Sequence, residues 1–244
     1  MAENTALDFI EQNGQKFIHV STINTVEANT QFVQNVQVVQ RQRQAVVELN
    51  QRAKTALTDA ERTAALEKSK EIVKKLEENN QAMARAYGYS LARDYLHQIL
   101  KTRIFLKLTD AEYAAAKDDA AVPAEQLLVK GDDKFRLIAE IPGAEANTQF
   151  RHNVQVMHNL RQQLVALNES IKKMPESEEK AKALENVKTA EENLIKNNDL
   201  MIKQYGFSLA RDYLMEIVES KLYTKVNEEE FLAAQKKASE AAAQ

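Results

Sequence analysis

The chain contains no cysteine, and its 244 residues include only five glycines and three prolines. The absence of cysteine excludes disulfides, thiolate catalysis and cysteine-ligated metal sites. The scarcity of glycine and proline leaves few turn residues for an all-β fold, whereas the abundant alanine, glutamine, glutamate, lysine and leucine favour helices. The composition therefore predicts an all-α protein.

The chain also lacks an excess of charge and any long apolar run. Its net charge of −3 gives no reason to expect nucleic acid as a partner, because nucleic-acid binding usually requires a basic face. No window approaches 18 apolar residues, so no membrane span is expected. The first residues, Met1 to Thr5, have neither the basic start nor the apolar stretch of a signal peptide, so the cytoplasm is the expected compartment.

What the sequence does contain is an internal repeat. The stretch Tyr87–Leu96 recurs as Tyr205–Leu214, 118 residues later, with nine of ten positions identical. The block Glu27–Phe32 recurs at the same offset as Glu145–Phe150. The sequence therefore predicts two tandem repeats of about 118 residues, and the expected divisions are residues 1–118, residues 119–236 and a short C-terminal tail, 237–244.

Each copy is predicted to hold a long antiparallel helical hairpin. A first helix is expected from about Asn24 to about Ala56, and a return helix from the capping box Thr58–Glu61 to the region of Gly88. Each of these helices is expected to face its partner with an inner stripe, a row of polar and apolar residues spaced by three and four positions, as in a coiled coil. In the first copy this stripe comprises Val36, Val39, Arg43, Val46, Asn50 and Ala53.

The segments before and after each hairpin are harder to assign. Residues 6–13 and 123–130 are predicted as short helices, mainly because Pro123 is followed by Ala-Glu-Gln-Leu-Leu. The dipeptides Asn13-Gly14 and Gly131-Asp132 favour β-hairpins instead, so segments 1–25 and 119–143 stay open between the two. After Gly88 the sequence predicts a kinked or new helix to about residue 107, followed by a short helix capped at Thr109.

The two most similar blocks are predicted to meet at the open end of each hairpin. One interpretation is a joint between the copies, in which Arg93 and Asp94 pair with Asp212 and Arg211. The other is a ligand pocket in each copy, in which arginine would favour a carboxylate or phosphate. Contacts with another chain are a third possibility. The candidate residues are Asn29, Gln31, Asn35, Asn80, Tyr87, Gly88, Ser90, Arg93, Asp94, Asn147, Gln149, Asn153, Asn198, Tyr205, Gly206, Ser208, Arg211 and Asp212.

No catalytic or metal-binding motif accompanies these residues. The nearest match to a di-iron motif is Asp94-x-x-His97, and the second copy has Met215 in place of the histidine. None of the four histidines recurs at the repeat offset, and phosphate loops, nucleophile elbows and zinc-protease motifs are absent. The sequence therefore predicts no metal site, no cofactor and no catalytic residues.

By elimination, the sequence predicts a non-enzymatic structural or scaffolding protein of helical repeats. It would assemble with itself as a homo-oligomer or bind another protein. The alternative is a soluble helical receptor with one pocket for an anionic ligand in each repeat, around Arg93 and Arg211. An enzyme that uses tyrosine, arginine and aspartate alone is a third class.

Overall fold

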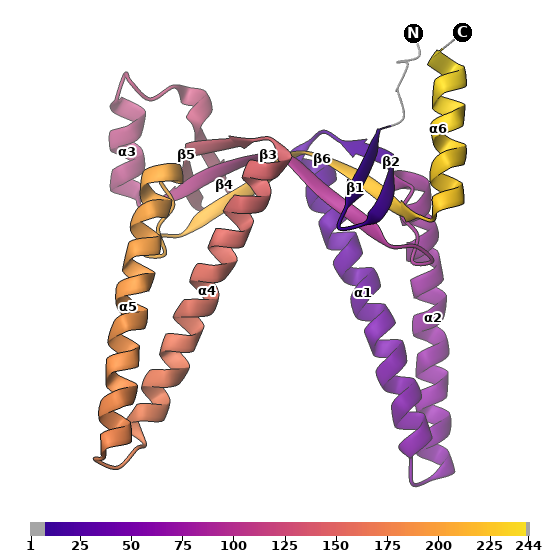
Figure 1. Ribbon diagram of the computed structural model, residues 1–244, viewed down its shortest axis with the longest axis horizontal. Coiled ribbons are helices and arrows are strands. Elements are labelled where there is room, and N and C mark those ends of the chain that lie inside the picture. The colour runs from indigo at the N-terminus through magenta and orange to yellow at the C-terminus, as the bar shows by residue number, and fades with distance from the viewer. Residues whose placement is uncertain (1–7, 243–244) are drawn as a thin grey trace. The chain divides into compact units, whose positions relative to one another are not determined.

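The computed structural model describes residues 8–242, which form a mixed α and β protein (Figure 1). The described part contains six β-strands, six α-helices and one short 3-10 helix. The predicted all-α class is therefore wrong, as is the description of the chain as a coiled-coil protein of helical hairpins. Long helical pairs are present, but each rests on antiparallel strands formed by segments that the sequence had favoured as helices.

The chain divides into two compact units that do not follow the repeat boundaries. Unit 1 combines residues up to 98 with residues from 217 on, and unit 2 comprises residues 99–216. Unit 1 contains β1 (Phe9–Gln12), β2 (Gln15–Ile23), α1 (Val26–Thr55), α2 (Asp59–Tyr87), the start of β3 (Tyr95–Leu108), the end of β6 (Tyr213–Val226) and α6 (Glu228–Ala242). Residues 237–242 of the predicted tail thus continue a helix.

Unit 2 repeats this arrangement with the roles of the two copies exchanged. It contains the rest of β3, α3 (Asp110–Asp118), η1 (Ala124–Gln126), β4 (Leu127–Lys130), β5 (Asp133–Pro142), α4 (Ala144–Lys172), α5 (Glu178–Tyr205) and the start of β6. The long strands β3 and β6 each leave one unit and enter the other near their middle. Each unit therefore takes its two long helices from one repeat. The end of a long strand and the helix that follows it come from the other repeat: β6 and α6 in unit 1, β3 and α3 in unit 2.

The start of each copy is a β-hairpin, not a short helix. In the first copy, β1 pairs with β2 across Asn13 and Gly14, which both have positive φ, as the favoured two-residue turn requires. In the second copy, β4 pairs with β5 across Gly131 and Asp132. Pro123 precedes only the 3-10 turn η1. The turn dipeptides were thus the better signal, because they close a register that buries Phe17 and Phe135.

The predicted helix after Gly88 is strand β3, and its equivalent is β6. Ile104 and Phe105 are adjacent and both buried, although neighbouring strand residues point to opposite faces. Both faces of the unit 2 strands are covered, because α4 and α5 lie on one side of them and α3 lies on the other (Figure 1). A strand buried on both faces loses the alternation by which strands are recognised, so its apolar run resembles one side of a helix.

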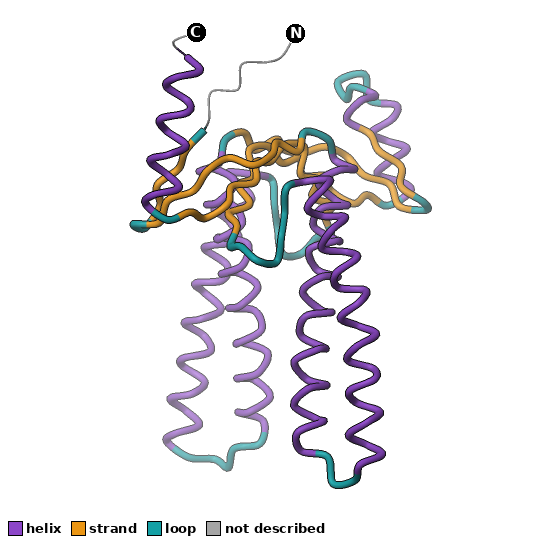
Figure 2. The backbone as a smooth tube through the Cα atoms, turned by 90° about the vertical axis from the view of Figure 1, so that its right-hand side faces the viewer, coloured by secondary structure: helices purple, strands orange, loops and turns teal. Residues whose placement is uncertain are grey.

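The long helices begin and end close to their expected positions. Thr58 caps α2 by accepting a hydrogen bond from the Glu61 N–H, and Gly88 ends it in the left-handed conformation. The cap of α1 is Thr25, one residue after the expected Asn24. Figure 2 shows the loop that joins each helical pair at the end far from the strands. Polar residues of the inner stripe bridge the helices, as where Ser69 donates to Asn50 over 3.0 Å.

The hydrophobic core of each unit contains one residue from the other repeat. Five core residues of unit 1 have equivalents 118 positions later in the core of unit 2, and the sixth position is filled from the opposite repeat. The unit 1 core is Ile23, Phe32, Val39, Met83, Tyr89 and Leu222, and the unit 2 core is Ile141, Phe150, Met157, Met201, Phe207 and Ile104. Leu222 and Ile104 are fully buried, so neither unit has a complete core without its exchanged strand.

Candidate functional site

Asn29 and Asn147, both predicted as site residues, are buried where a strand turns into a long helix. The Asn29 amide donates to the carbonyl oxygens of Ile23 and Thr25, and its Oδ1 accepts from the Ser220 hydroxyl. Asn147 donates in the same way to the Ile141 and Gly143 carbonyls. These side chains satisfy backbone groups that would otherwise be buried without partners, so they have a structural role in the fold.

The repeated stretch after each helical pair is a closed, hydrogen-bonded loop. The Tyr95 hydroxyl donates to the Gly88 carbonyl and accepts from the Ser90 N–H, while Asn80 accepts from the Leu91 N–H. The second copy repeats these bonds with Tyr213, Gly206, Ser208, Asn198 and Leu209. Tyr87 and Tyr205 place their rings edge-on against Phe32 and Phe150. The near identity of the two stretches is therefore explained by loop structure.

Arg93 and Arg211 pair with glutamates from the opposite repeat. The partner of Arg93 is Glu230, at 2.9 Å, and the partner of Arg211 is Glu112, at 3.1 Å. The predicted partners of Arg93 and Arg211 were aspartates; Asp94 and Asp212 instead accept backbone N–H groups through their carbonyls. Both ion pairs are partly exposed and contribute little stability. Each arginine thus has a carboxylate partner within its own unit.

Each of these glutamates also caps the helix in which it lies. The Glu112 carboxylate accepts from the Thr109 N–H, and the Glu230 carboxylate accepts from the Asn227 N–H. These backbone hydrogen bonds are the main reason that the pKa of each glutamate lies below its ordinary value, with the arginines adding to the shift. The predicted arginine site is therefore an anchor between a loop and a short helix.

The remaining predicted residues are polar side chains on the helix surface. Gln31 donates to Asn35, and Gln149 donates to Asn153, each over 2.8 Å within one helix. Asn80 accepts a hydrogen bond from the Leu91 N–H and so caps the loop after α2. The structure thus assigns the predicted residues to several local roles.

Sequence reasoning missed a buried polar chain in unit 1 that contains a serine, a histidine and an asparagine. His97 Nε2 lies 2.8 Å from Ser220 Oγ, which donates to Asn29. The serine stands between the other two and is fully buried, so no substrate can reach its oxygen. In a nucleophilic triad the histidine would occupy the middle and the serine would be open. These three hydrogen-bonded side chains are therefore a polar part of the core.

A second missed cluster joins the segment before β1 to β6. The Asp8 carboxylate accepts from Lys221 over 2.7 Å and from the Tyr223 hydroxyl over 2.8 Å. The Lys221 hydrogen bond lowers the pKa of Asp8, and burial raises the pKa of Tyr223. Tyr223 therefore stays neutral as a donor. No sequence motif marks these residues, because Asp8 lies more than 200 positions before Lys221 and Tyr223. Neither these three residues nor the neighbouring His19 recurs at the repeat offset.

His19 is expected to make unit 1 less stable in mild acid. Burial is the main cause that lowers the pKa of His19 below its ordinary 6.5, with Lys221 adding to it. The unfolded chain then binds the proton more readily, so this stabilisation is present above about pH 6.5 and is lost as the pH falls toward the folded-state pKa. Urea unfolding at about pH 7.5 and about pH 5 measures the loss, in a range above the Asp8 titration.

The His19→Leu variant is expected to lose this pH dependence and to fold, because Leu137 occupies the equivalent place in unit 2. His158→Gln is the matched control, since His158 is exposed on α4 and its counterpart is Gln40. It should keep the pH dependence of the unchanged chain. Equal pH dependence in His19→Leu and the unchanged chain would contradict the assignment.

The remaining candidate site is an apolar surface on the helical pairs. Val47 on α1 and Leu66 on α2 are 58% and 42% exposed. Their equivalents Val165 and Leu184 are the same residues and are 61% and 49% exposed. We call these four residues the arm pairs. Exposed apolar residues are common singly, but a repeated exposed pair has no explanation in the packing of either unit.

The two residues of an arm pair lie on the same side of their hairpin. Val47 directly follows the half-buried Val46, and Leu66 directly follows the buried Ala65. Val46 and Ala65 face the partner helix, and the next residue in an α-helix is rotated by about 100° about the helix axis. Because the two right-handed helices run in opposite directions, this rotation turns Val47 and Leu66 to the same side of the pair. The same relation holds for Val165 and Leu184. Each hairpin therefore presents its arm pair on one face.

No family model, curated protein or solved structure matches this chain. Among residues 8–242, no group of three or more histidine or carboxylate side chains is placed to hold a metal ion. None of the helices in this range combines the length and apolar character needed to cross a bilayer. Any function must therefore be argued from the chain's own residues.

Proposed function

We propose that this chain is a non-enzymatic structural protein that assembles with further copies of itself through its two long helical pairs. The observation that carries the proposal is the recurrence of the exposed arm pairs at the repeat offset. The arm pairs flank the hairpin tips, and the tips themselves differ, since Gln51–Arg62 shares little with Glu169–Lys180. Two apolar residues that are exposed and identical in both copies favour a role outside the fold of either unit.

A second copy of the chain is the partner that this surface favours. Each chain carries the same apolar pair twice, so one kind of contact can link it to more than one neighbour, and two weak contacts act together. The helices around the arm pairs carry both lysine and glutamate, and the net charge is −3, which favours a protein over nucleic acid. The cytoplasm stays the expected compartment.

Replacing all four arm-pair residues with lysine is expected to abolish assembly without unfolding the chain. The four side chains are exposed, so the substitutions should change the free energy of unfolding by less than about 0.5 kcal/mol each. Charges of one sign on an apolar contact repel and must also be desolvated. Sedimentation velocity and native mass spectrometry report the mass of the assembly, and circular dichroism with urea reports the fold.

The matched control places lysine at exposed polar positions of the same hairpins, for example Gln51→Lys with Thr63→Lys. This control adds charge but leaves the arm pairs unchanged, so it should assemble normally. A lysine-substituted arm-pair variant that assembles as the unchanged chain does would contradict the proposal. So would an unchanged chain that stays monomeric at about 100 μM, a concentration at which contacts of even modest affinity are populated.

A further inference from the structure

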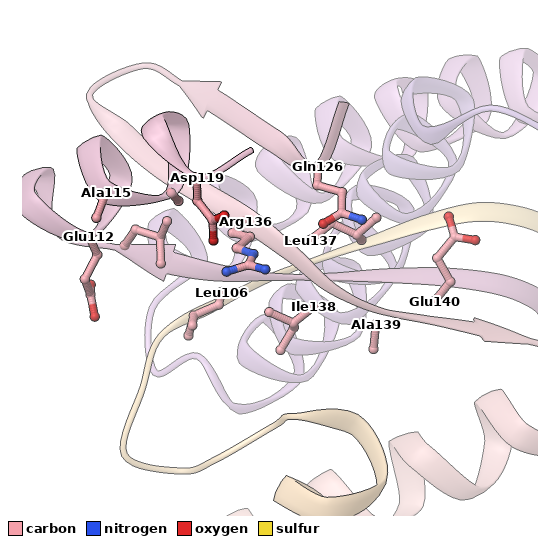
Figure 3. A pocket seen from close by; sticks show the side chains of 12 residues that line it. Leu106, Glu112, Ala115, Asp119, Gln126, Arg136, Leu137, Ile138, Ala139 and Glu140 are labelled. Carbon is pink, nitrogen blue, oxygen red and sulfur yellow. The ribbon is translucent and has the colours of Figure 1, made fainter. Parts of the chain in front are cut away.

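Unit 2 contains a pocket on the side of β5 that α3 covers (Figure 3). Its volume is about 880 Å³, and its walls come from the end of β3, α3, the Gln126 end of η1, and β5. Pockets of about 300–1,000 Å³ are the usual size for small-molecule ligands. Leu106, Leu137 and Ala115 give it apolar walls, and Arg136 projects into its middle.

Arg136 is the one cationic side chain in the pocket wall, and it is half-buried. Among the described residues its guanidinium has neither an ion-pair partner nor a hydrogen-bond acceptor. Its neighbours across the sheet are Leu106 and Leu127, which provide no acceptor side chain. A partly desolvated guanidinium without a partner favours a bound anion, because its planar donors match two carboxylate oxygens.

The acidic residues of the wall are already engaged elsewhere. Glu112 binds Arg211 and Thr109, and Glu140 binds Lys101 and Arg103. The Arg103 hydrogen bond is the largest cause that lowers the pKa of Glu140, so its charge is both present and compensated. Asp119 accepts from the Ala121 N–H. Among the described residues, none of these carboxylates forms an ion pair with Arg136.

The fold does not require a cation at this place. The equivalent of Arg136 in unit 1 is Ile18, which occupies the same position on β2. The equivalent of Gln126 is Asp8, which in unit 1 is tied to Lys221 and Tyr223. Unit 2 thus combines an arginine and an uncharged amide at positions where unit 1 has an apolar residue and a bound carboxylate.

We propose that the unit 2 pocket binds a small organic monocarboxylate with an apolar body. The Arg136 guanidinium holds the carboxylate in a two-pronged contact, and the Gln126 amide lies on the same wall as an additional donor. Leu106, Leu137 and Ala115 cover the apolar body. This inference is independent of assembly through the arm pairs, so either proposal can fail alone.

The test follows the arginine Nε–H signals and the backbone amide signals of β5 in the full chain by NMR while 3-methylbutanoate is added. The amide signals report the affinity of the variants that lack Arg136. One Nε–H signal, assigned to Arg136 by its loss in Arg136→Ile, is expected to shift saturably.

The Arg136→Ile variant should bind 3-methylbutanoate at least about tenfold more weakly, because it removes a charge-assisted contact. It should fold, because unit 1 has isoleucine at the equivalent position. Arg136→Lys should be intermediate, since it keeps the charge but loses the planar fork. The control, Arg151→Ala on the exposed face of α4, should bind as the unchanged chain does.

Two further probes identify what is recognised. Inorganic phosphate and the uncharged 3-methyl-1-butanol are each expected to bind more weakly than 3-methylbutanoate. Phosphate binding as tight as that of the carboxylate would overturn the role of the apolar walls, and equal binding of the alcohol would overturn the role of Arg136. Absence of a saturable shift in the unchanged chain, or binding to Arg136→Ile with unchanged affinity, would overturn the proposal as a whole.

Discussion

Gly88→Ala is expected to destabilise unit 1 by about 2–5 kcal/mol, and Gly206→Ala to destabilise unit 2 by only about 1–2 kcal/mol. Both glycines end a long helix with φ near +67°, at 68° and 66°, so both substitutions carry the same backbone strain. They differ in their surroundings. A Cβ at position 88 would lie 2.2 Å from Val20 Cγ1, whereas a Cβ at position 206 would lie 3.3 Å from Ile138 Cδ1.

The difference between the two neighbours explains the unequal cost. Val20 and Ile138 are equivalent residues, each the extra residue where the pairing of its strand shifts register. The Val20 methyl group is fixed close to the strand by a branched side chain, whereas Ile138 meets the glycine with the end of a longer one. A 2.2 Å contact forces the β2 bulge and the end of α2 apart, but a 3.3 Å contact needs only a small adjustment.

Urea unfolding of the two variants measures the effect, and amide hydrogen exchange in α2 and α5 assigns each loss to its unit. Combining Gly88→Ala with Val20→Ala should recover about 1–2 kcal/mol relative to the sum of the single changes, because the second change removes the clashing methyl group. A cost for Gly206→Ala equal to that for Gly88→Ala would contradict the close contact with Val20.

Asn29→Ala is expected to cost unit 1 about 3–5 kcal/mol, more than Asn147→Ala costs unit 2, at about 2–3 kcal/mol. Both side chains are almost completely buried and donate to two nearby carbonyls. Asn29 also accepts from Ser220, whereas Asn147 Oδ1 has no hydrogen-bond partner among the described residues. Removal of Asn29 therefore leaves one more buried polar group unsatisfied.

The comparison is made by urea unfolding at constant pH, with the Ser220→Ala variant as a control. Ser220→Ala should lower the free energy of unfolding by less than Asn29→Ala does. The double variant should lower it by less than the sum of the two single effects, because both single variants lose the same Asn29–Ser220 hydrogen bond. Additive effects, or a larger loss for Asn147→Ala, would show that the Asn29–Ser220 hydrogen bond does not contribute as the geometry implies.

The two asparagines also show how far the sequence could locate important residues. Identity between the copies pointed to Asn29, Gly88 and the stretch Tyr87–Leu96 as residues kept in both copies. It did not distinguish a structural constraint from a ligand site, because both keep the same residues in both copies. The hydrogen bonds give a structural role to Asn29 and Tyr95, because both side chains bond to backbone groups.

The cluster of Asp8, Lys221 and Tyr223 and the pocket around Arg136 were beyond sequence reasoning for a different reason. Their members come from distant parts of the chain, and they break the repeat instead of following it. A search for repeated residues passes over positions such as Arg136, where the other copy has Ile18. The differences between the copies were therefore as informative as the similarities.

By itself the sequence determined the duplication, the helical pairs and their caps, because these depend on residues close together along the chain. Thr58, Glu61 and Gly88 act within one helical turn of the groups that they satisfy. The long strands β3 and β6, their exchange between the units and the composition of each core were decided only by tertiary structure. A strand has no hydrogen bonds of its own, so its identity depends on a partner that lies elsewhere in the chain. Ile104 and Leu222 belong to the cores of units whose helices lie in the other repeat, and no local pattern records that choice.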